Sequence, residues 1–428
     1  MSSNNPRPTR RQFLRRGAIA AGAAVVSPQL IPGRALGADG GVPPSEQIVV
    51  GGIGIGNRGN YDLRCFLGNA DVRFVAVCDV KESRRKAVKQ HVDRHYKNDK
   101  CDTYRDFRDL LDRQDIEAVL IATGPNWHCN MSVQAARAGK DIYCEKPCTK
   151  NIRESLVLAE VMQRTARIFQ AGTQRRNVPH FAVACELART GRLGKLTAVH
   201  AHPRGMHAGM SGWAKPQPEP PKEEVDWDLY LGPAAWRPFN SRFLNGFNFE
   251  KGGGLVGGGV LEWGSHCVDL CQWAMGDAPP PVEYNPPVNK EIVAVYESGT
   301  KLVLRERGWL PLGSCPVRFE GEDGWVEAGD SGKLVLSSPE LIAGRHVPEI
   351  GGYPATFHVR DFLDCVKSRS QPKTNAVAAC RAHIACHAAN IALFLGRQVN
   401  LDLDTFTFPE DPQANRLRSE AIRSPLRI

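Results

Sequence analysis

The chain has 428 residues, of which 42% are hydrophobic and 24% are charged. This composition is typical of an ordinary soluble protein with room for two domains, and it excludes a mainly disordered or fibrous chain. The formal charge of +9 would suit a nucleic-acid partner, but six of the nine excess positive charges are arginines in residues 1–38, which contain no acid. The charge on the rest of the chain is too small to imply nucleic acid, and we expect none as a partner.

Residues 1–38 have the pattern of an export signal. Arg10 and Arg11 begin a short motif with Phe13 and Leu14, a mildly apolar run covers 17–26, and small residues follow at 35–38. The run is too short to span a membrane, so the pattern predicts a twin-arginine signal peptide rather than an anchor. The alternative is a disordered basic tail. We therefore expect export by the twin-arginine machinery, to the periplasm or elsewhere outside the cytoplasm.

The cysteines predict neither a disulfide framework nor a metal site. There are 13 of them, an odd number, and no Cys-x-x-Cys pair occurs. Proteins on the twin-arginine route fold in the reducing cytosol before export, which is consistent with free thiols packed as small apolar residues.

From residue 46 onward, apolar runs alternate with amphipathic stretches in the order that a parallel sheet requires. The predicted strands cover 47–53, 73–78, 118–122, 141–144 and 167–171. Apolar residues at helical spacing predict helices over 60–68, 82–96, 107–113, 128–138 and 153–165. This βαβ succession predicts a dinucleotide-binding Rossmann domain over residues 46–175.

The pattern changes in the second half of the chain, where we expect an α+β domain over 176–404 with an open, mainly antiparallel sheet. A helix is predicted at 179–189, a strand at 195–202, and a long loop region up to 259. Alternating strands follow at 291–296, 301–305, 317–319, 324–328 and 333–336. Two late helices, 357–367 and 376–395, would cover one face of this sheet. Residues 405–428 are expected to form a C-terminal tail.

A glycine-rich turn carries the most specific chemical signal. Gly54, Gly56 and Gly59 end a strand and open a helix, and Asp79 follows Gly59 by 20 residues at the end of the next strand. The glycines permit a tight turn, close approach to a pyrophosphate and helix packing, and the helix N-terminus favours the phosphates. Asp79 would bind the adenosine ribose hydroxyls, so NAD is the expected cofactor. Lys81, Arg84 and Arg85 leave NADP open, although a basic surface helix explains them equally simply.

A second cluster, Cys144 to Pro147, stands at the carboxyl end of a predicted strand, where open α/β sheets bind their ligands. Lys146 would lie there beside the nicotinamide and could polarise a substrate hydroxyl or pass a proton. From the local sequence alone, a surface lysine before a helix-starting proline remains the alternative.

A third cluster covers residues 257–269. If Glu262 begins a helix, His266 lies one turn later on the same face, so that the carboxylate could orient the imidazole and the imidazole could take a hydroxyl proton. The spacing also fits two metal ligands, but no third ligand is evident and we expect no metal. A packed core histidine is the alternative.

Together these segments resemble one family. The glycine turn, Asp79, the run 139–147, the run 171–176 and the cluster 257–269 are similar, in order, to the glucose-fructose oxidoreductase, inositol dehydrogenase and MocA (Gfo/Idh/MocA) family, over residues 47 to about 404. The resemblance implies a Rossmann domain followed by an open α/β domain whose sheet forms contacts in a homo-oligomer. It also implies a carbohydrate or polyol substrate.

The resemblance assigns roles to residues of this chain. Lys146 would be the active-site lysine and His266 the acid/base, with Glu262 where the family usually has Asp, one methylene shorter. The expected cofactor-binding residues are Gly54, Gly56, Asn57, Arg58, Gly59, Asp79, Pro125, Asn126, His128, Glu145 and Lys146. The expected substrate-binding residues are Lys146, Gln174, Arg176, Arg204, Arg237 and His266. Independently of the resemblance, the loop region offers His202, His207 and Trp213 beside Arg204 and Arg237 as polar and aromatic groups suited to a sugar, and a solvated loop with incidental aromatics is the alternative.

The expected activity is hydride transfer between a sugar or polyol hydroxyl carbon and a nicotinamide cofactor. An NAD-dependent glycoside hydrolase, which oxidises a sugar transiently and eliminates the aglycone, would use the same residues, and a sugar sensor would keep only the fold. Since dinucleotides are scarce outside the cytosol, we expect NAD to be inserted before export and to stay tightly bound.

Overall fold

The computed structural model describes residues 42–206, 214–245 and 259–426. The chain divides into a short unit, Met1–Gln47, in which a 3-10 turn covers Pro44–Glu46, and a large unit, Ile48–Ile428. The predicted export signal lies outside the described residues. All elements below belong to the large unit.

Six parallel strands form the first sheet, in the order β3-β2-β1-β4-β5-β6. They are β1 (Ile48–Ile53), β2 (Val72–Cys78), β3 (Asp102–Tyr104), β4 (Ala118–Ile121), β5 (Asp141–Cys144) and β6 (Phe169–Ala171). This is the order of a Rossmann fold, whose ligand crevice lies at the carboxyl ends of β1 and β4 where the strand order reverses. The predicted Rossmann fold is confirmed; β3, with only three residues, was not predicted.

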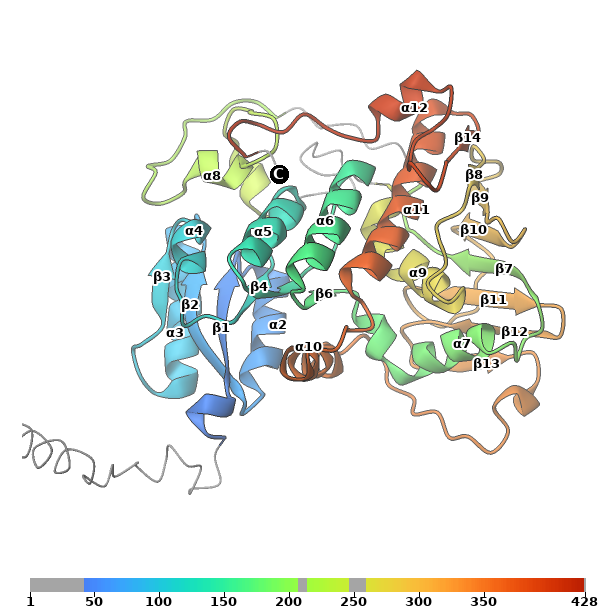
Figure 1. Ribbon diagram of the computed structural model, residues 1–428, viewed down its shortest axis with the longest axis horizontal. Helices are drawn as coiled ribbons and strands as arrows, with labels where there is room; N and C mark the ends of the chain where they lie inside the picture. The colour runs from blue at the N-terminus through green and yellow to red at the C-terminus, as the bar shows by residue number, and fades with distance from the viewer. Residues whose placement is uncertain (1–41, 207–213, 246–258, 427–428) are drawn as a thin grey trace, which may run out of the picture. The chain divides into compact units, whose positions relative to one another are not determined.

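Helices cover both faces of this sheet (Figure 1). The helices are α2 (Asn57–Leu67), α3 (Glu82–Tyr96), α4 (Phe107–Leu111), α5 (Pro125–Arg137) and α6 (Ile152–Thr165). One apolar core joins α2 and α3 to the sheet, and a second joins α4, α5 and α6 to the opposite face. Helix α10 (Thr356–Ser368) lies with α2 in the first of these cores.

The position of α10 corrects a prediction, because this helix was expected to cover the second sheet. Its buried residues Val359, Phe362 and Leu363 belong to the Rossmann core, and Phe362 packs edge-on against Tyr143 of β5. Arg360 also forms an ion pair of 2.8 Å with Asp71 before β2. The amphipathic pattern predicts the buried face of α10 but carries no information on which sheet that face meets.

Eight strands form the second sheet, in the order β13-β12-β11-β7-β10-β9-β8-β14. They are β7 (Leu196–Ala201), β8 (Glu283–Tyr284), β9 (Glu291–Val295), β10 (Lys301–Arg305), β11 (Val317–Gly321), β12 (Gly324–Ala328), β13 (Leu334–Leu336) and β14 (Val399–Asn400). The pair β7–β10 is parallel and the other pairs are antiparallel. The expected open, mainly antiparallel sheet is confirmed.

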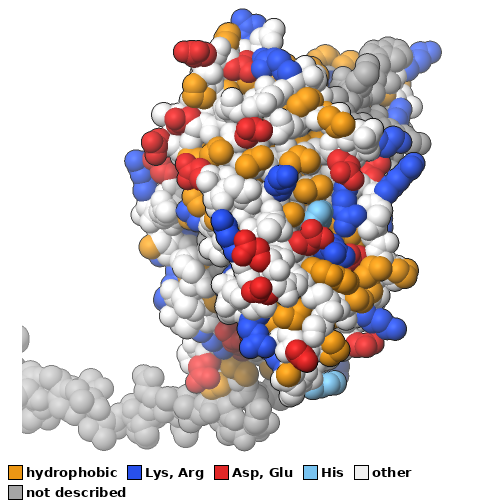
Figure 2. All heavy atoms as spheres, turned by 90° about the vertical axis from the view of Figure 1, so that its right-hand side faces the viewer, with side chains coloured by type: hydrophobic (Ala, Val, Ile, Leu, Met, Phe, Trp, Pro, Cys, Tyr) orange, Lys and Arg blue, Asp and Glu red, His pale blue; other side chains and the backbone are white. Residues whose placement is uncertain are grey.

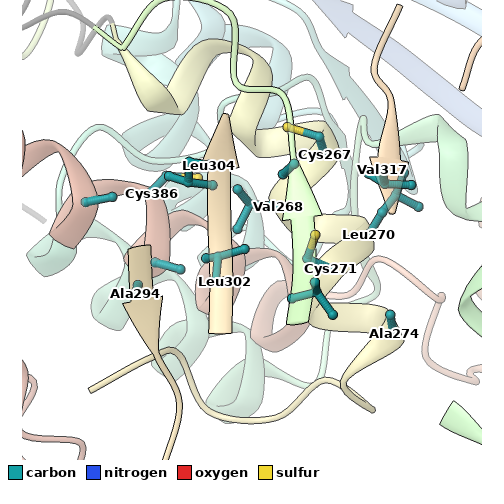
Figure 3. Close-up of a cluster of buried hydrophobic side chains, with 14 of the residues drawn as sticks. Cys267, Val268, Leu270, Cys271, Ala274, Ala294, Leu302, Leu304, Val317 and Cys386 are labelled. Carbon is teal, nitrogen blue, oxygen red and sulfur yellow. The ribbon is translucent and has the colours of Figure 1, made fainter. Parts of the chain in front are cut away.

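Helices α7 (Pro179–Arg189) and α9 (Val260–Ala274) cover the inner face of the second sheet, and α11 (Ala376–Leu395) packs behind α9. Figure 3 shows Val268 and Cys271 of α9 beside Leu302 and Leu304 of β10. Helix α11 also contacts α6, so it lies between the two halves of the unit (Figure 1). Its length and apolar composition would suit a membrane span, but most of its residues are buried in the protein.

The outer face of the second sheet carries no helix in the described part of the chain. Leu302 and Leu304 point inward, which places Val303 of the same strand on the outer face. Arg318 lies 3.9 Å from the ring centroid of Trp325 there. Figure 2 looks onto this side of the molecule, where hydrophobic side chains lie among charged ones.

A buried ion-pair network holds the turn after β6 against α9. Arg176 is completely buried and donates to both carboxylate oxygens of Asp269 at 2.8 Å and to Asp277 at 2.8 Å. Asp269 is 1% exposed. Paired in this way, the charges satisfy one another, but neither would be tolerated alone.

We predict that Arg176→Ala lowers the free energy of unfolding by about 3–5 kcal/mol, because it leaves the Asp269 carboxylate buried without its cation. Urea denaturation followed by circular dichroism measures the loss. Arg189→Ala is the matched control, since Arg189 also lies over Trp273, at 5.3 Å, but is exposed. Equal losses in the two variants would contradict a structural role for the buried pair.

Candidate active site

The glycine turn has the geometry of a dinucleotide cradle. Gly54 has φ +70°, and a Cβ there would lie 2.3 Å from Cγ2 of Thr123. A Cβ at Gly59 would lie 2.9 Å from Cβ of Ala122, so α2 can approach β4 only with glycine at this position. Gly56 is the N-cap of α2 and provides no side-chain cap, which leaves the first amides of the helix available to a pyrophosphate.

Asp79 is placed to accept a hydrogen bond from a ribose. It is 6% exposed, and its Oδ1 accepts from the Lys81 amide at 2.9 Å. Its Oδ2 is buried and has no hydrogen-bond partner among the described residues; the nearest cation is Nη1 of Arg84, 3.8 Å away. Burial raises the pKa of Asp79, against the opposing effect of Arg84. A ribose hydroxyl would satisfy this acceptor, so the residues present fit NAD.

A cleft of about 550 Å³ runs along the carboxyl edge of the parallel sheet. Its lining includes ten of the eleven residues predicted to bind the cofactor: Gly54, Gly56, Asn57, Arg58, Asp79, Pro125, Asn126, His128, Glu145 and Lys146. The eleventh, Gly59, lies under the turn. His128 is held by two main-chain carbonyls, with Nδ1 2.8 Å from the oxygen of Pro147 and Nε2 3.1 Å from that of Thr123.

At the inner end of the cleft, Lys146 meets Glu262 from the other half of the unit. Nζ of Lys146 lies 2.7 Å from Oε1 of Glu262, and both side chains are 20% exposed. This contact corrects the expectation that Glu262 orients His266: among the described residues its carboxylate bonds to Lys146, and its other oxygen, Oε2, is buried without a partner. The extra methylene of glutamate extends the reach of this carboxylate from α9 toward Lys146.

His266 lies one turn further along α9 and is 7% exposed. Its Nδ1 is buried and has no partner in the part of the chain that the structure describes. Burial lowers the pKa of His266 well below its ordinary value, and the positive charges of Arg175 and Lys146 lower it further. The imidazole is therefore neutral at neutral pH and can accept a proton.

Glu145 is held by a buried network that the sequence did not reveal. Nε of Arg58 lies 3.2 Å and Nε2 of Gln174 2.8 Å from Oε1 of Glu145, and Arg58 also pairs with Asp62 at 3.0 Å. Asp62 is fully buried, and desolvation followed by the charge of Glu145 raises its pKa well above the usual range. The network therefore favours the protonated form of Asp62 more than water does. The spacing of Arg58 and Asp62, four residues apart on α2, is the only sequence signal for this pair.

The residues predicted to bind substrate lie in different places. Gln174 supports Glu145, and Arg176 has its donors occupied by Asp269, Asp277 and a carbonyl, so neither is in our candidate site. Arg237 lies over the ring of Phe243 and is not among the residues that line the cleft. Arg204 lies over Trp263, next to Glu262 in the chain. His202 stacks on Trp309, whereas His207 and Trp213 lie outside the described residues.

Comparison with known proteins identifies the family. One family model, "Oxidoreductase family, NAD-binding Rossmann fold", matches residues 48–173, and a second, for the C-terminal α/β domain, matches 206–428. The chain belongs to the Gfo/Idh/MocA oxidoreductase family. Its first half is therefore an NAD-binding Rossmann domain. Among the described residues, no group of three or more His, Cys, Asp or Glu side chains could hold a metal ion.

Individual relatives match over parts of their length. The chain is 30% identical over 147 residues to the inositol 2-dehydrogenase of Rhizobium meliloti, covering 34% of this chain and 42% of that protein. It is 30% identical over 128 residues to glycosyl hydrolase family 109 protein 1 of Shewanella sp. MR-4, covering 29% and 28%. The structure of aldose-aldose oxidoreductase from Caulobacter crescentus has a TM-score of 0.59 at 18% identity, covering 83% of this chain and all of that chain. That structural likeness shows the fold.

Within this family member, residues 222–244 return from the second domain and lie against the cofactor cleft; we call them the strap. The strap contains α8 (Trp227–Leu231), and its residues Leu229, Tyr230 and Leu244 line the cleft. Nε1 of Trp127 donates to the carbonyl of Leu229 at 2.7 Å, and Nδ2 of Asn126 donates to that of Leu231 at 2.9 Å. Sequence reasoning assigned this segment to a loop region.

The C-terminal tail holds the strap from the other side. Arg423 donates to a carboxylate oxygen of Asp228 at 2.6 Å and to the carbonyl of Gly232 at 2.9 Å. On the sheet side, Nζ of Lys81 donates to the carbonyl of Leu244 at 3.0 Å. The strap is therefore fixed at its helix and at its end, which favours a cofactor that does not leave readily.

We predict that Asp79→Ser raises the ratio of bound NADP to bound NAD about tenfold, because the carboxylate that repels a 2′-phosphate is lost while Arg84 remains. Mass spectrometry of the dinucleotide that copurifies with the protein measures this ratio. Glu82→Gln, which changes a partly exposed acid of α3, the helix that carries Arg84, is the control. An unchanged ratio in Asp79→Ser would contradict the placement of the ribose at Asp79.

Proposed function

We propose that this protein is an NAD-dependent oxidoreductase that transfers hydride between a CH–OH carbon of a sugar or polyol and a retained nicotinamide cofactor. The observation that carries the proposal is the 2.7 Å contact of Lys146, which lines a cleft whose residues fit NAD, with Glu262 of α9, one helical turn before neutral His266. NADP remains open as the cofactor because Arg84 lies beside Asp79.

In the oxidising direction, bound NAD supplies the hydride acceptor. Neutral His266 takes the proton of the reacting hydroxyl, and Lys146 donates a hydrogen bond to the same oxygen as it becomes a carbonyl. Glu262 holds the Lys146 ammonium in place through the 2.7 Å contact. A retained cofactor would have to be reoxidised in place, either by a second, carbonyl-containing substrate or by reversal of the same reaction. In the reducing direction, each proton moves the opposite way.

The second candidate is an NAD-dependent glycoside hydrolase. The match to a family 109 glycosyl hydrolase, at 30% identity over 128 residues, supports this alternative. The same residues would oxidise a hydroxyl transiently, after which the acidified neighbouring C–H allows elimination of the aglycone. Cleavage of an aryl glycoside with no net change in nicotinamide absorbance would favour the hydrolase, whereas a requirement for a carbonyl co-substrate would favour the oxidoreductase.

We also propose that the protein is exported by the twin-arginine machinery and carries its NAD with it. The contacts of the strap with Trp127, Asn126 and Lys81 support a retained cofactor. A homo-oligomer is proposed through the outer face of the second sheet, whose exposed hydrophobic residues (Figure 2) support such a contact.

We predict that Lys146→Ala retains bound NAD but reduces it with sugar at least about 100-fold more slowly, the usual contribution of a positioned proton donor. Growth of the nicotinamide absorbance in a single turnover with excess sugar measures the rate. Glu262→Gln keeps the hydrogen bond without the charge and should lose less. Lys195→Ala, an exposed lysine at the start of β7, is the control. Full activity of Lys146→Ala would remove Lys146 from the mechanism.

We predict that the wild-type protein keeps its dinucleotide through extensive dialysis and that Arg423→Ala loses it at least about tenfold faster, since the strap is released from the tail. The dinucleotide content after dialysis, measured by mass spectrometry, tests both statements. Arg416→Ala, an exposed change in α12 (Pro412–Arg416), serves as the control. Ready loss of NAD from the wild type would contradict the retained cofactor.

A further inference from the structure

Five side chains form a continuous stack beside the candidate active site, in the order Arg58, Tyr353, Arg175, Trp263 and Arg204. Each arginine Cζ lies over an aromatic ring, and the successive distances to the ring centroids are 5.8, 4.5, 5.8 and 4.5 Å. We call this set the arginine–aromatic stack. Its members come from α2, the loop before α10, the 3-10 turn Gln174–Asn177, α9 and the segment after β7. These segments are far apart in the chain, so the stack forms only through the tertiary fold.

Both ends of the stack lie next to residues of the candidate active site. Arg58 bonds to Glu145, the neighbour of Lys146, and Trp263 follows Glu262 in the first turn of α9. The ring centroid of Trp263 lies 6.2 Å from that of His266. Trp263 therefore places one end of the stack beside both Glu262 and His266.

Arg175 is built to present one free donor group. It is 1% exposed, and Asp330 holds Nε at 2.8 Å and Nη2 at 2.6 Å. Ser314 in turn donates to Asp330 at 2.6 Å, which fixes the pair. Nη1 of Arg175 is buried and has no hydrogen-bond partner among the described residues. Buried donors without partners are rare in native proteins, and a charged donor held rigidly in this way suits an anionic ligand.

Arg204 offers a second guanidinium at Trp263, with its Cζ 4.5 Å from the ring centroid. It is exposed, and no carboxylate of the described residues forms an ion pair with it. Its backbone has φ +47°, in the left-handed region that non-glycine residues rarely adopt, and such strain is frequent at ligand clamps. Arg175 and Arg204 thus lie on one tryptophan, each with donors that are not committed to a described acid.

We propose that the substrate is a sugar acid, whose carboxylate is bound by Arg175 and Arg204 while its ring lies against Trp263. This rests on the proposed oxidoreductase function and adds the substrate class. Planar guanidinium groups match the geometry of a carboxylate, and a neutral sugar would leave Nη1 of Arg175 without a charged partner. A site whose donors are placed for a carboxylate should bind a sugar acid much better than the neutral sugar that lacks this acceptor.

The test compares matched sugars on the holoprotein. We expect glucuronate and galacturonate to bind, by calorimetry, and to reduce the bound cofactor at concentrations at least about tenfold lower than glucose and galactose. Arg204→Gln should raise the uronate concentration for half-saturation roughly ten- to a hundredfold and raise that of the neutral sugars by a much smaller factor. Arg175→Lys, which keeps one donor to Asp330, should act in the same direction. Arg164→Gln, an exposed arginine of α6, is the control.

The outcomes separate this inference from the proposed function. Equal binding of neutral sugars and uronates, or an equal loss for both classes in Arg204→Gln, overturns the sugar-acid substrate and leaves the oxidoreductase intact. Uronate binding that depends on Arg204 without any change in nicotinamide absorbance supports the site and overturns the oxidoreductase. If the protein prefers glucose 6-phosphate to glucuronate, the proposal that the bound anion is a carboxylate is overturned. Because Arg204 is exposed, its variant remains informative even if Arg175→Lys folds poorly.

Discussion

The contact between Lys146 and Glu262 joins the two halves of the molecule at the point of chemistry. Lys146 follows β5 of the parallel sheet, and Glu262 stands in the first turn of α9, which belongs to the second domain. A 2.7 Å contact between side chains tolerates little relative movement of the elements that carry them. Helix α11 provides the needed rigidity because it packs on both α6 and α9. The candidate active site is therefore formed at the interface between two cores, and neither domain contains it alone.

The parts of the site that are local in the chain could be predicted from the sequence. Gly54, Gly56 and Gly59 are needed by a strand, a turn and a helix that follow one another directly, and their close approaches to Thr123 and Ala122 explain why no larger residue fits. The order of strands in the first sheet follows from the same βαβ logic. Resemblance to the family added Lys146 and His266, which local sequence left undecided.

The long-range parts could not be predicted, for reasons that the structure makes clear. The helical spacing of Glu262 and His266 suggested a pair, but a carboxylate bonds to the nearest unpaired cation, and Lys146 arrives from 116 positions away in the chain. The face of α10 was evident, yet its partner is the Rossmann core. The strap and the stacking of Arg175 on Tyr353 depend likewise on loop paths that carry no periodic signal.

Four buried polar atoms of the candidate site and the stack have no hydrogen-bond partner among the described residues: Oδ2 of Asp79, Oε2 of Glu262, Nδ1 of His266 and Nη1 of Arg175. In native proteins the great majority of buried polar groups are paired, since each unpaired one costs about 1–3 kcal/mol. Here the acceptor Asp79 lies where a ribose would donate, and the donor Arg175 lies where an anion would accept. Burial, aided by the neighbouring cations, lowers the pKa of His266 and keeps it neutral, and one carboxylate oxygen of Glu262 is bonded to Lys146. The unpaired group at the cofactor end is thus an acceptor, and the one at the proposed substrate end is a donor. The ribose of NAD would pair with the first, and the carboxylate of a sugar acid would pair with the second.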